Sequence, residues 1–144
     1  MTSRSQQMLR QKGRRSSDSF IRIPHHVVNH ENFRTLSPRA TKLLIDLLAQ
    51  FRGYNNGDLA ATLKMMQERG WNSSDQLNKA KNELVDRDII WVTRQGGRNK
   101  ACLYAVTFFP IDECKGKLDV ASTRTAPVNW KNRLSSPLVG VKGS

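Results

Sequence analysis

The sequence predicts one small α+β domain in which three helices are followed by a β-hairpin. The length of 144 residues is typical of a single domain. Apolar residues recur at spacings of three and four between residues 37 and 87, which is the period of amphipathic helices. Beyond residue 88, two β-rich runs flank Gly96-Gly97, a pattern typical of a hairpin. Hydrophobic residues make up only 38% of the chain, so we expect part of it to lie outside the core.

Positive charge is concentrated at the two ends of the chain and divides it into three parts. Residues 1–19 contain five basic residues and one acid, and residues 114–144 contain six basic residues and one acid. Nine of the twelve net positive charges therefore lie outside residues 20–113. We predict a disordered basic tail over 1–19, a folded domain over 20–113 and a mostly irregular basic tail over 114–144. Such tails attract phosphate regardless of its sequence, although they could also serve solubility alone.

The first predicted elements include one clear helix. Residues 20–24 form a β-prone run that ends at a proline, and we interpret it as an edge strand. Residues 25–33 are consistent with a helical turn. Ser37 is a suitable N-cap and Pro38 suits the first position of a helix over Ser37–Arg52. One apolar stripe along this helix comprises Ala40, Leu43, Leu44, Leu47, Leu48 and Phe51.

Two further helices are predicted, joined by a tight turn. A short helix begins with Asp58 as its cap and ends at Gly70. Its apolar face comprises Leu59, Leu63 and Met66. Ser73 and Gln76 match the capping-box pattern at the start of a third helix over residues 74–87. Its inward positions are Leu77, Ala80, Leu84 and Val85. Two helices joined by a short turn that contains glycine form a helix-turn-helix unit.

The strands come last in the predicted order. Residues 89–93 and 101–107 are β-rich, and the polar stretch 94–100 connects them. Three helices and a hairpin in this order predict a winged helix-turn-helix domain, in which the run at 20–24 completes a three-stranded sheet. Within the C-terminal tail, Trp130 either packs back on the domain or stacks on a partner, because a lone exposed Trp is unfavourable.

Three runs of the sequence carry a resemblance to a known group of proteins. They are NNGDLAATLKMMQERGW, LNKAKNELVDRDIIWVTRQGG and LYAVTFFPIDE. They resemble winged helix-turn-helix DNA-binding proteins of bacterial phages, plasmids and integrative elements. The resemblance spans roughly residues 20–113 and leaves out both tails. It implies a transcription regulator or a replication-associated protein of a mobile element.

Candidate DNA contacts follow from the predicted fold, because the second helix of a helix-turn-helix places its first residues nearest the base edges. Asn and Gln suit adenine, Ser suits either edge, and Lys suits guanine or a phosphate. The predicted base-contacting residues are Ser74, Gln76, Asn78, Lys79 and Asn82. The predicted contacts of the wing are Arg94, Arg98, Asn99 and Lys100, and those to the DNA backbone are Arg39, Lys42, Arg14 and Arg15. For any single residue of the helix an ordinary surface role is the better interpretation, whereas the face as a whole favours DNA. For the wing and for Arg39 and Lys42 the two interpretations are equal. Asp75 would repel phosphate unless it only serves the helix N-terminus.

The sequence gives no indication of an enzyme, a cofactor or a metal site. It contains no glycine-rich phosphate loop and no arrangement that would activate a Ser or Cys. The three histidines, His25, His26 and His30, lack the further ligands of a tetrahedral zinc site. Cys102 and Cys114 are interpreted as free thiols. No apolar run approaches the roughly 20 residues that span a bilayer, and the N-terminus lacks the apolar core of a secretory signal. We expect a non-enzymatic cytoplasmic protein that does not contact membranes.

Two functions from different classes are consistent with these observations. The first is sequence-selective binding of double-stranded DNA, with a homodimer as an open possibility because palindromic sites are usual for this fold. The alternative is a protein-interaction module that acts on a nucleoprotein complex, such as a replication or host-defence assembly. The small net charge of residues 20–113 favours this alternative. RNA binding through the tails is a third hypothesis, and the domain offers no stacking motif for it.

Overall fold

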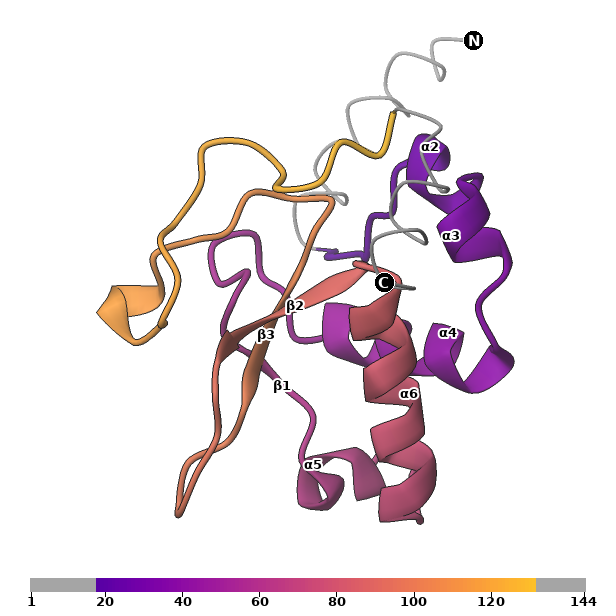
Figure 1. Ribbon diagram of the computed structural model, residues 1–144, viewed down its shortest axis with the longest axis vertical. Coiled ribbons are helices and arrows are strands. Elements are labelled where there is room, and N and C mark those ends of the chain that lie inside the picture. The colour runs from indigo at the N-terminus through magenta and orange to yellow at the C-terminus, as the bar shows by residue number, and fades with distance from the viewer. Residues whose placement is uncertain (1–17, 132–144) are drawn as a thin grey trace, which may run out of the picture.

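The computed structural model describes residues 18–131, which combine helices with a small antiparallel sheet (Figure 1). The helices and strands in this part of the chain are α2 (His25–Val28), α3 (Glu31–Arg34), α4 (Pro38–Leu48), β1 (Leu59–Ala60), α5 (Leu63–Gln67), α6 (Ser74–Asp86), β2 (Ile90–Arg94) and β3 (Leu103–Val106). A single 3-10 turn, Cys114–Gly116, follows them. The predicted α+β class is confirmed, with the sheet in the order β1-β3-β2.

Helix α4 forms where the sequence predicts it, for the predicted reasons. The side chain of Ser37 caps it by accepting a hydrogen bond from the backbone N–H of Ala40 at 3.1 Å, and Pro38 occupies its first position. Its buried apolar residues are Ala40, Leu43, Leu44, Leu47 and Leu48. The helix ends at Leu48, four residues before the predicted end, and the chain then turns away at Gly53 with a φ of 94°.

The predicted start of the second helix is wrong. Residues 59–60 form strand β1 instead, with Leu59 opposite Tyr104 of β3. The cause is the fully buried Asn56 just before them. Its side-chain amide donates to the carbonyl of Val106 at 3.0 Å, and its Oδ1 accepts from the backbone N–H of Val106 at 2.9 Å. These bonds hold the chain alongside β3, so α5 begins only after Thr62, whose side chain caps it.

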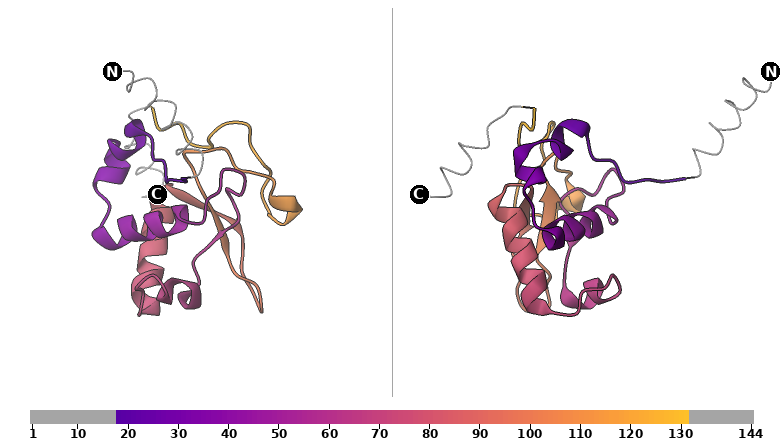
Figure 2. Two further views of the ribbon diagram at one scale, coloured as in Figure 1. Left: turned by 180° about the vertical axis from the view of Figure 1, so that it is seen from behind. Right: turned by 90° about the vertical axis from the view of Figure 1, so that its right-hand side faces the viewer.

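The edge strand predicted at residues 20–24 is also wrong. Residues 18–24 contain no strand, and the outer edge of β3 is occupied by β1. The segment runs as an extended arm towards one side of the molecule (Figure 2). Phe20 is 73% exposed and Ile21 is 43% exposed, so the β-propensity of this run has no pairing partner to satisfy it.

Helix α6 and the hairpin agree closely with the prediction. Ser73 caps α6 by accepting from the backbone N–H of Gln76 at 3.2 Å. The inward residues Leu77, Ala80 and Leu84 are buried. Strands β2 and β3 pair in antiparallel fashion, with an irregularity in register between Val92 and Arg94. Helices α4 and α6 pack on each other and, with the sheet, enclose one apolar core.

Part of the segment predicted as a C-terminal tail packs on the domain. Trp130 is 4% exposed, and its indole N–H donates to the hydroxyl of Thr107 at 3.1 Å. The ring of His30 lies edge-on to Trp130, with 4.9 Å between the centroids. The backbone N–H of Thr123 donates to the carbonyl of Ile111 at 2.9 Å. Trp130 therefore packs back on the domain, and residues 114–131 are structurally continuous with it.

Candidate nucleic-acid interface

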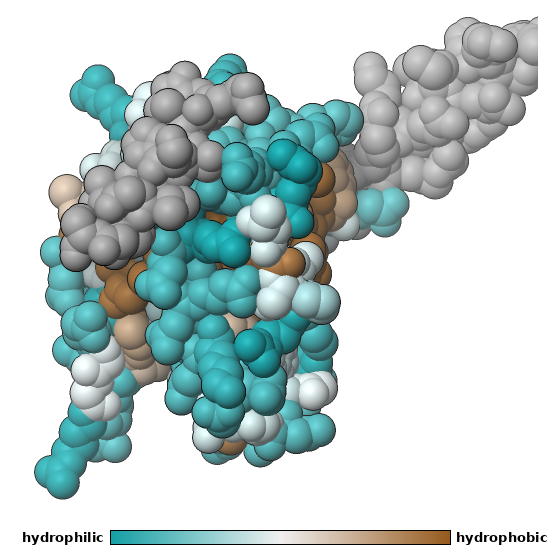
Figure 3. All heavy atoms as spheres, turned by 45° about the vertical axis from the view of Figure 1, so that its right-hand side comes forward, coloured by the Kyte–Doolittle hydropathy of each residue, from teal (hydrophilic) through white to brown (hydrophobic). Residues whose placement is uncertain are grey.

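The outer face of α6 is polar and open. Ser74, Asn78, Lys79 and Asn82 are all exposed, on the side of the helix opposite its buried apolar residues. The space-filling view shows this region as largely hydrophilic, with a finger-like projection beside it (Figure 3). Lys81 lies on another side, where it is half-buried near Cys102, and burial lowers the pKa of its ammonium group. All five predicted base-contacting residues, Gln76 included, are therefore exposed.

Gln76, the fifth predicted residue, lies at the border between α6 and α4. Nη1 of Arg39 donates a hydrogen bond of 2.6 Å to its Oε1. Arg39, predicted to contact phosphate, is partly buried. The structure thus brings a predicted base contact and a predicted phosphate contact together as partners of one another. Gln76 retains the two donors of its amide for another ligand while this bond stays intact.

Lys79 is paired within α6. Its ammonium lies 3.2 Å from a carboxylate oxygen of Asp75, one turn earlier, and both side chains are more than half exposed. An exposed pair of this kind contributes only about 0.3–0.5 kcal/mol, so Lys79 can exchange Asp75 for a phosphate at little cost. Asp86 adds a further exposed acid towards the end of α6. The outer face of α6 therefore carries two acids against one lysine, a net charge of −1.

Lys42 is about half exposed, but its ammonium group is held by bonds within the domain. Its ammonium donates to Asp46 at 2.9 Å and to the backbone carbonyl of Arg69 at 2.7 Å. Asp46 is only 3% exposed and also accepts from the guanidinium of Arg69 and from the indole N–H of Trp71, each at 2.7 Å. Because Arg69 and Trp71 lie between α5 and α6, this network fixes α4 to the turn of the predicted helix-turn-helix.

Asp46 is a residue that the sequence analysis missed. Burial alone would raise the pKa of its carboxyl, but the hydrogen bonds from Arg69, Lys42 and Trp71 outweigh burial and lower this pKa below its ordinary value. One signal in the sequence points to it. An acid stands between Leu44 and Leu47, within the apolar side of a helix, where an unpaired charge is strongly disfavoured.

The tip of the β2–β3 hairpin presents three of the four predicted wing residues. Arg98, Asn99 and Lys100 are exposed, and Gly97 and Lys100 close the tip through two backbone hydrogen bonds of 2.9 and 3.1 Å. Arg94 differs from them. It is partly buried, and its Nη2 donates to the backbone carbonyl of Ala101 at 2.9 Å, so it braces the base of the hairpin.

Positive charge gathers at one end of the molecule. The first turns of α6, helix α5 and the hairpin tip all lie at the lower end in Figure 1 and in both views of Figure 2. The segments that form this end, 63–82 and 94–100, contain two acids, Glu68 and Asp75, and seven basic residues, namely Lys64, Arg69, Lys79, Lys81, Arg94, Arg98 and Lys100. The rest of residues 18–131 contains ten basic residues and ten acids. We call this region the basic end.

The remaining predictions concern two N-terminal arginines, the histidines, metal binding and membranes. Arg14 and Arg15 lie outside the described residues. His30 caps α3, with its Nδ1 accepting from the backbone N–H of Asn32 at 3.0 Å. Within residues 18–131 no three His, Cys, Asp or Glu side chains are grouped as metal ligands would be. The helices of this same range include none long and apolar enough to cross a membrane.

No protein-family model matches the chain, and no curated protein or solved structure does either. The exposed face of α6, the hairpin and the distribution of charge are therefore the features that bear on function.

Proposed function

We propose that this protein binds double-stranded DNA through its basic end and acts as a winged helix-turn-helix protein. In this proposal α6 enters the major groove and the β2–β3 hairpin serves as the wing. The observation that carries the proposal is the location of charge: the whole net positive charge of residues 18–131 lies in the segments that form the basic end. Phosphate attracts such a surface and is the dominant source of affinity in protein–DNA complexes.

Side chains of the outer face of α6 suit base recognition. Ser74, Asn78 and Asn82 are exposed, uncharged and able both to donate and to accept hydrogen bonds. Asn pairs bidentately with adenine in the major groove, and Ser bonds either edge. In the proposal these uncharged side chains contact bases and the basic elements beside α6 contact phosphates, because phosphate contacts set the position and base contacts set the specificity.

Surrounding basic residues supply the positioning contacts in the proposal. Arg98 and Lys100 at the hairpin tip reach the minor groove or the flanking backbone. Lys64, which is exposed, borders α6 on the α5 side, whereas the guanidinium of Arg69 is paired with Asp46. Lys42 acts indirectly, by holding Asp46 and the turn before α6.

A role in transcription or replication of a mobile element extends this proposal, and it is supported only by the resemblance of the sequence runs described above. The chain's surplus of basic over acidic residues is compatible with either role.

One observation favours the second candidate, a protein-interaction module acting on a nucleoprotein complex. The outer face of α6 carries Asp75 and Asp86 against Lys79 alone, and acids on this face disfavour close approach to phosphate. In that case the basic end would contact acidic protein surfaces, and binding to free duplex DNA would be weak and indifferent to changes in α6.

The test is the salt dependence of binding to a labelled duplex, measured by fluorescence anisotropy with the full chain. R98Q/K100Q removes two charges from the hairpin tip, and R124Q/K131Q removes two exposed charges outside the basic end. The slope of log K against log salt is negative, and each lost phosphate contact makes it shallower by about 0.9. We expect R98Q/K100Q to make the slope shallower by about two and R124Q/K131Q to leave it unchanged. Equal effects of the two variants would refute a DNA-binding role for the basic end.

A further inference from the structure

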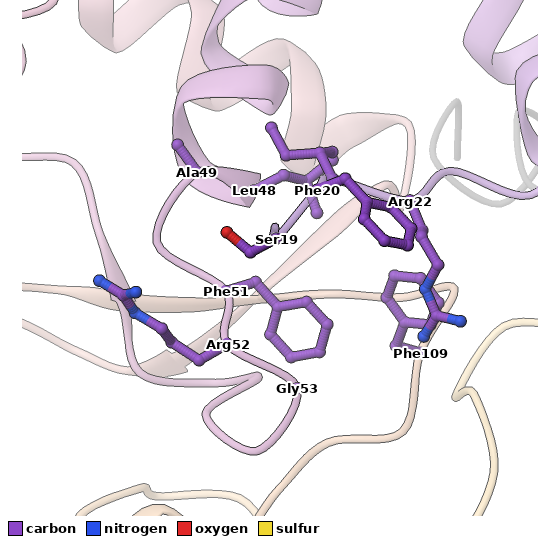
Figure 4. Close-up of a pocket in the computed structure, with 10 residues that line it drawn as sticks. Ser19, Phe20, Arg22, Leu48, Ala49, Phe51, Arg52, Gly53 and Phe109 are labelled. Carbon is purple, nitrogen blue, oxygen red and sulfur yellow. The ribbon is translucent and has the colours of Figure 1, made fainter. Parts of the chain in front are cut away.

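A pocket of about 440 Å³ lies away from the basic end, in the range typical of ligand sites. It forms where the arm at residues 19–22 passes Leu48 at the end of α4, the turn at residues 49–53, and Phe109 beyond β3 (Figure 4). None of its lining residues belongs to α5, α6 or the hairpin. A ligand in this pocket would therefore leave the basic end uncovered.

Aromatic rings form the floor of the pocket. Phe51 and Phe109 stack with their centroids 5.4 Å apart and their planes 21° apart, and both remain partly exposed. Phe20 stands at the mouth of the pocket and is 73% exposed. Exposed aromatic rings grouped around a concave surface are unfavourable in water and typical of a binding site. The pocket therefore suits an aromatic group that packs against these rings.

Two arginines give the pocket its charge. Figure 4 shows Arg52 on one side of the phenylalanine pair and Arg22 on the other, with the guanidinium of Arg22 6.0 Å from the centroid of Phe109. No acid lines the pocket, and neither arginine forms a salt bridge within residues 18–131. A guanidinium binds a carboxylate through two parallel hydrogen bonds.

We propose that this pocket binds a small aromatic carboxylate. Its ring would pack against the partly exposed pair of Phe51 and Phe109, and its carboxylate would accept hydrogen bonds from Arg22 or Arg52. The ring contributes by removing apolar surface from water, and the carboxylate contributes charge-assisted hydrogen bonds at the edge of the pocket. The pocket would thus select for the combination of a flat apolar body and one negative group.

Charge argues against two other occupants of the pocket. Residues 1–17 contain five basic residues and no acid, so the two arginines repel this segment. A second copy of the chain would bring a net charge of +12 and the same pair of arginines. An anion from outside the chain is therefore the occupant that the charges favour.

The test compares 2-naphthoate with 2-naphthamide, which has the same ring system and no charge, by isothermal titration calorimetry on the full chain. We expect naphthoate to bind about tenfold more tightly, because only the carboxylate forms charge-assisted bonds. R22Q/R52Q should abolish this preference and leave naphthamide binding unchanged. The matched variant R34Q/R124Q, which removes two exposed arginines outside the pocket, should keep the preference.

Three results would overturn the proposal: equal affinities for the two compounds, a preference that survives R22Q/R52Q, or no binding of naphthoate at concentrations of roughly 5 mM. The proposal is independent of DNA binding. R22Q/R52Q should bind duplex DNA as the natural chain does, so a failure of either proposal is recognised separately.

Discussion

Arg39 on α4 donates a hydrogen bond of 2.6 Å to the side chain of Gln76 on α6, across the boundary between the two helices. This bond orients Gln76 at the start of the helix that we place in the major groove. It also means that a change at Arg39 affects base recognition without Arg39 touching a base.

The Arg39–Gln76 pair predicts coupling between the two residues in DNA recognition. R39A and Q76A should each lower the preference for a specific site over a random duplex. The loss of preference in R39A/Q76A, expressed as a free energy, should be smaller than the sum of the two single losses. Residues that act through one shared bond are non-additive. Anisotropy measurements of all four proteins on both duplexes give the coupling free energy. Strict additivity would show that Arg39 does not position Gln76.

The two asparagines on the outer face of α6 should carry specificity. We expect N78A/N82A to lose about 1–3 kcal/mol of discrimination for each base contact, with little change on random DNA. K64Q, which removes an exposed charge from α5, is the comparison and should weaken binding to both duplexes by the same factor. If N78A/N82A weakened binding to both duplexes by the same factor, α6 would not determine specificity through base contacts.

The buried Asp46 should stabilise the fold in a pH-dependent way. D46A leaves the indole N–H of Trp71 buried without its acceptor, and we expect this to lower the free energy of unfolding by about 1–3 kcal/mol at pH 7. Lys42 and Arg69 are each about half exposed, so water can replace Asp46 for them. The measurement is urea denaturation of the natural chain and D46A.

The sign of the pH effect follows from the lowered pKa of Asp46. A group whose pKa falls on folding contributes stability above its unfolded pKa, near 3.9 for an ordinary Asp, and loses it as the pH falls through the folded pKa. The difference between the natural chain and D46A should therefore shrink below about pH 4. A difference that grew on acidification would contradict the network described here.

Trp130 should be essential to the stability of the domain although it lies in an irregular segment. Its indole is enclosed against Phe108 and His30, so we expect W130A to cost about 3–5 kcal/mol in the free energy of unfolding. V120A, at a residue that is 37% exposed in the same segment, is the control and should cost far less. A small loss for W130A in thermal or urea unfolding would show that residues 114–131 detach readily.

The sequence predicts the elements whose caps and apolar periods lie within the element itself. It does not predict elements that depend on residues far along the chain. Helices α4 and α6 have serine caps and strong apolar periods, so both were predicted closely. Strand β1 has two residues, too few for an alternating pattern, and it exists because Asn56 bonds the backbone of β3 fifty residues away. The arm at 20–24 has the opposite problem, because its residues are β-prone and yet pair with no strand of the sheet.

The same distinction applies to the candidate site. Exposure of Asn78 and Asn82 follows from the helical period of α6 and could be predicted. The internal roles of Lys42 and Arg39 depend on partners 27 and 37 residues further along the chain. The role of Arg94 likewise depends on the hairpin turn, which brings its guanidinium to the backbone carbonyl of Ala101. The pattern of apolar and polar residues predicts which face of a helix is exposed. The hydrogen-bond partners of a long side chain can be identified only from the folded structure.

The most direct test of the central claim is selection of binding sites from a random duplex pool by the full chain at about 0.15 M salt, where attraction between exposed charges is strongly screened. Sequence-selective recognition through α6 predicts that repeated rounds enrich one motif, and that N78A/N82A binds DNA but enriches a different motif or none. Retention of DNA without enrichment of any motif by the natural chain would contradict sequence-selective binding and leave only attraction to phosphate.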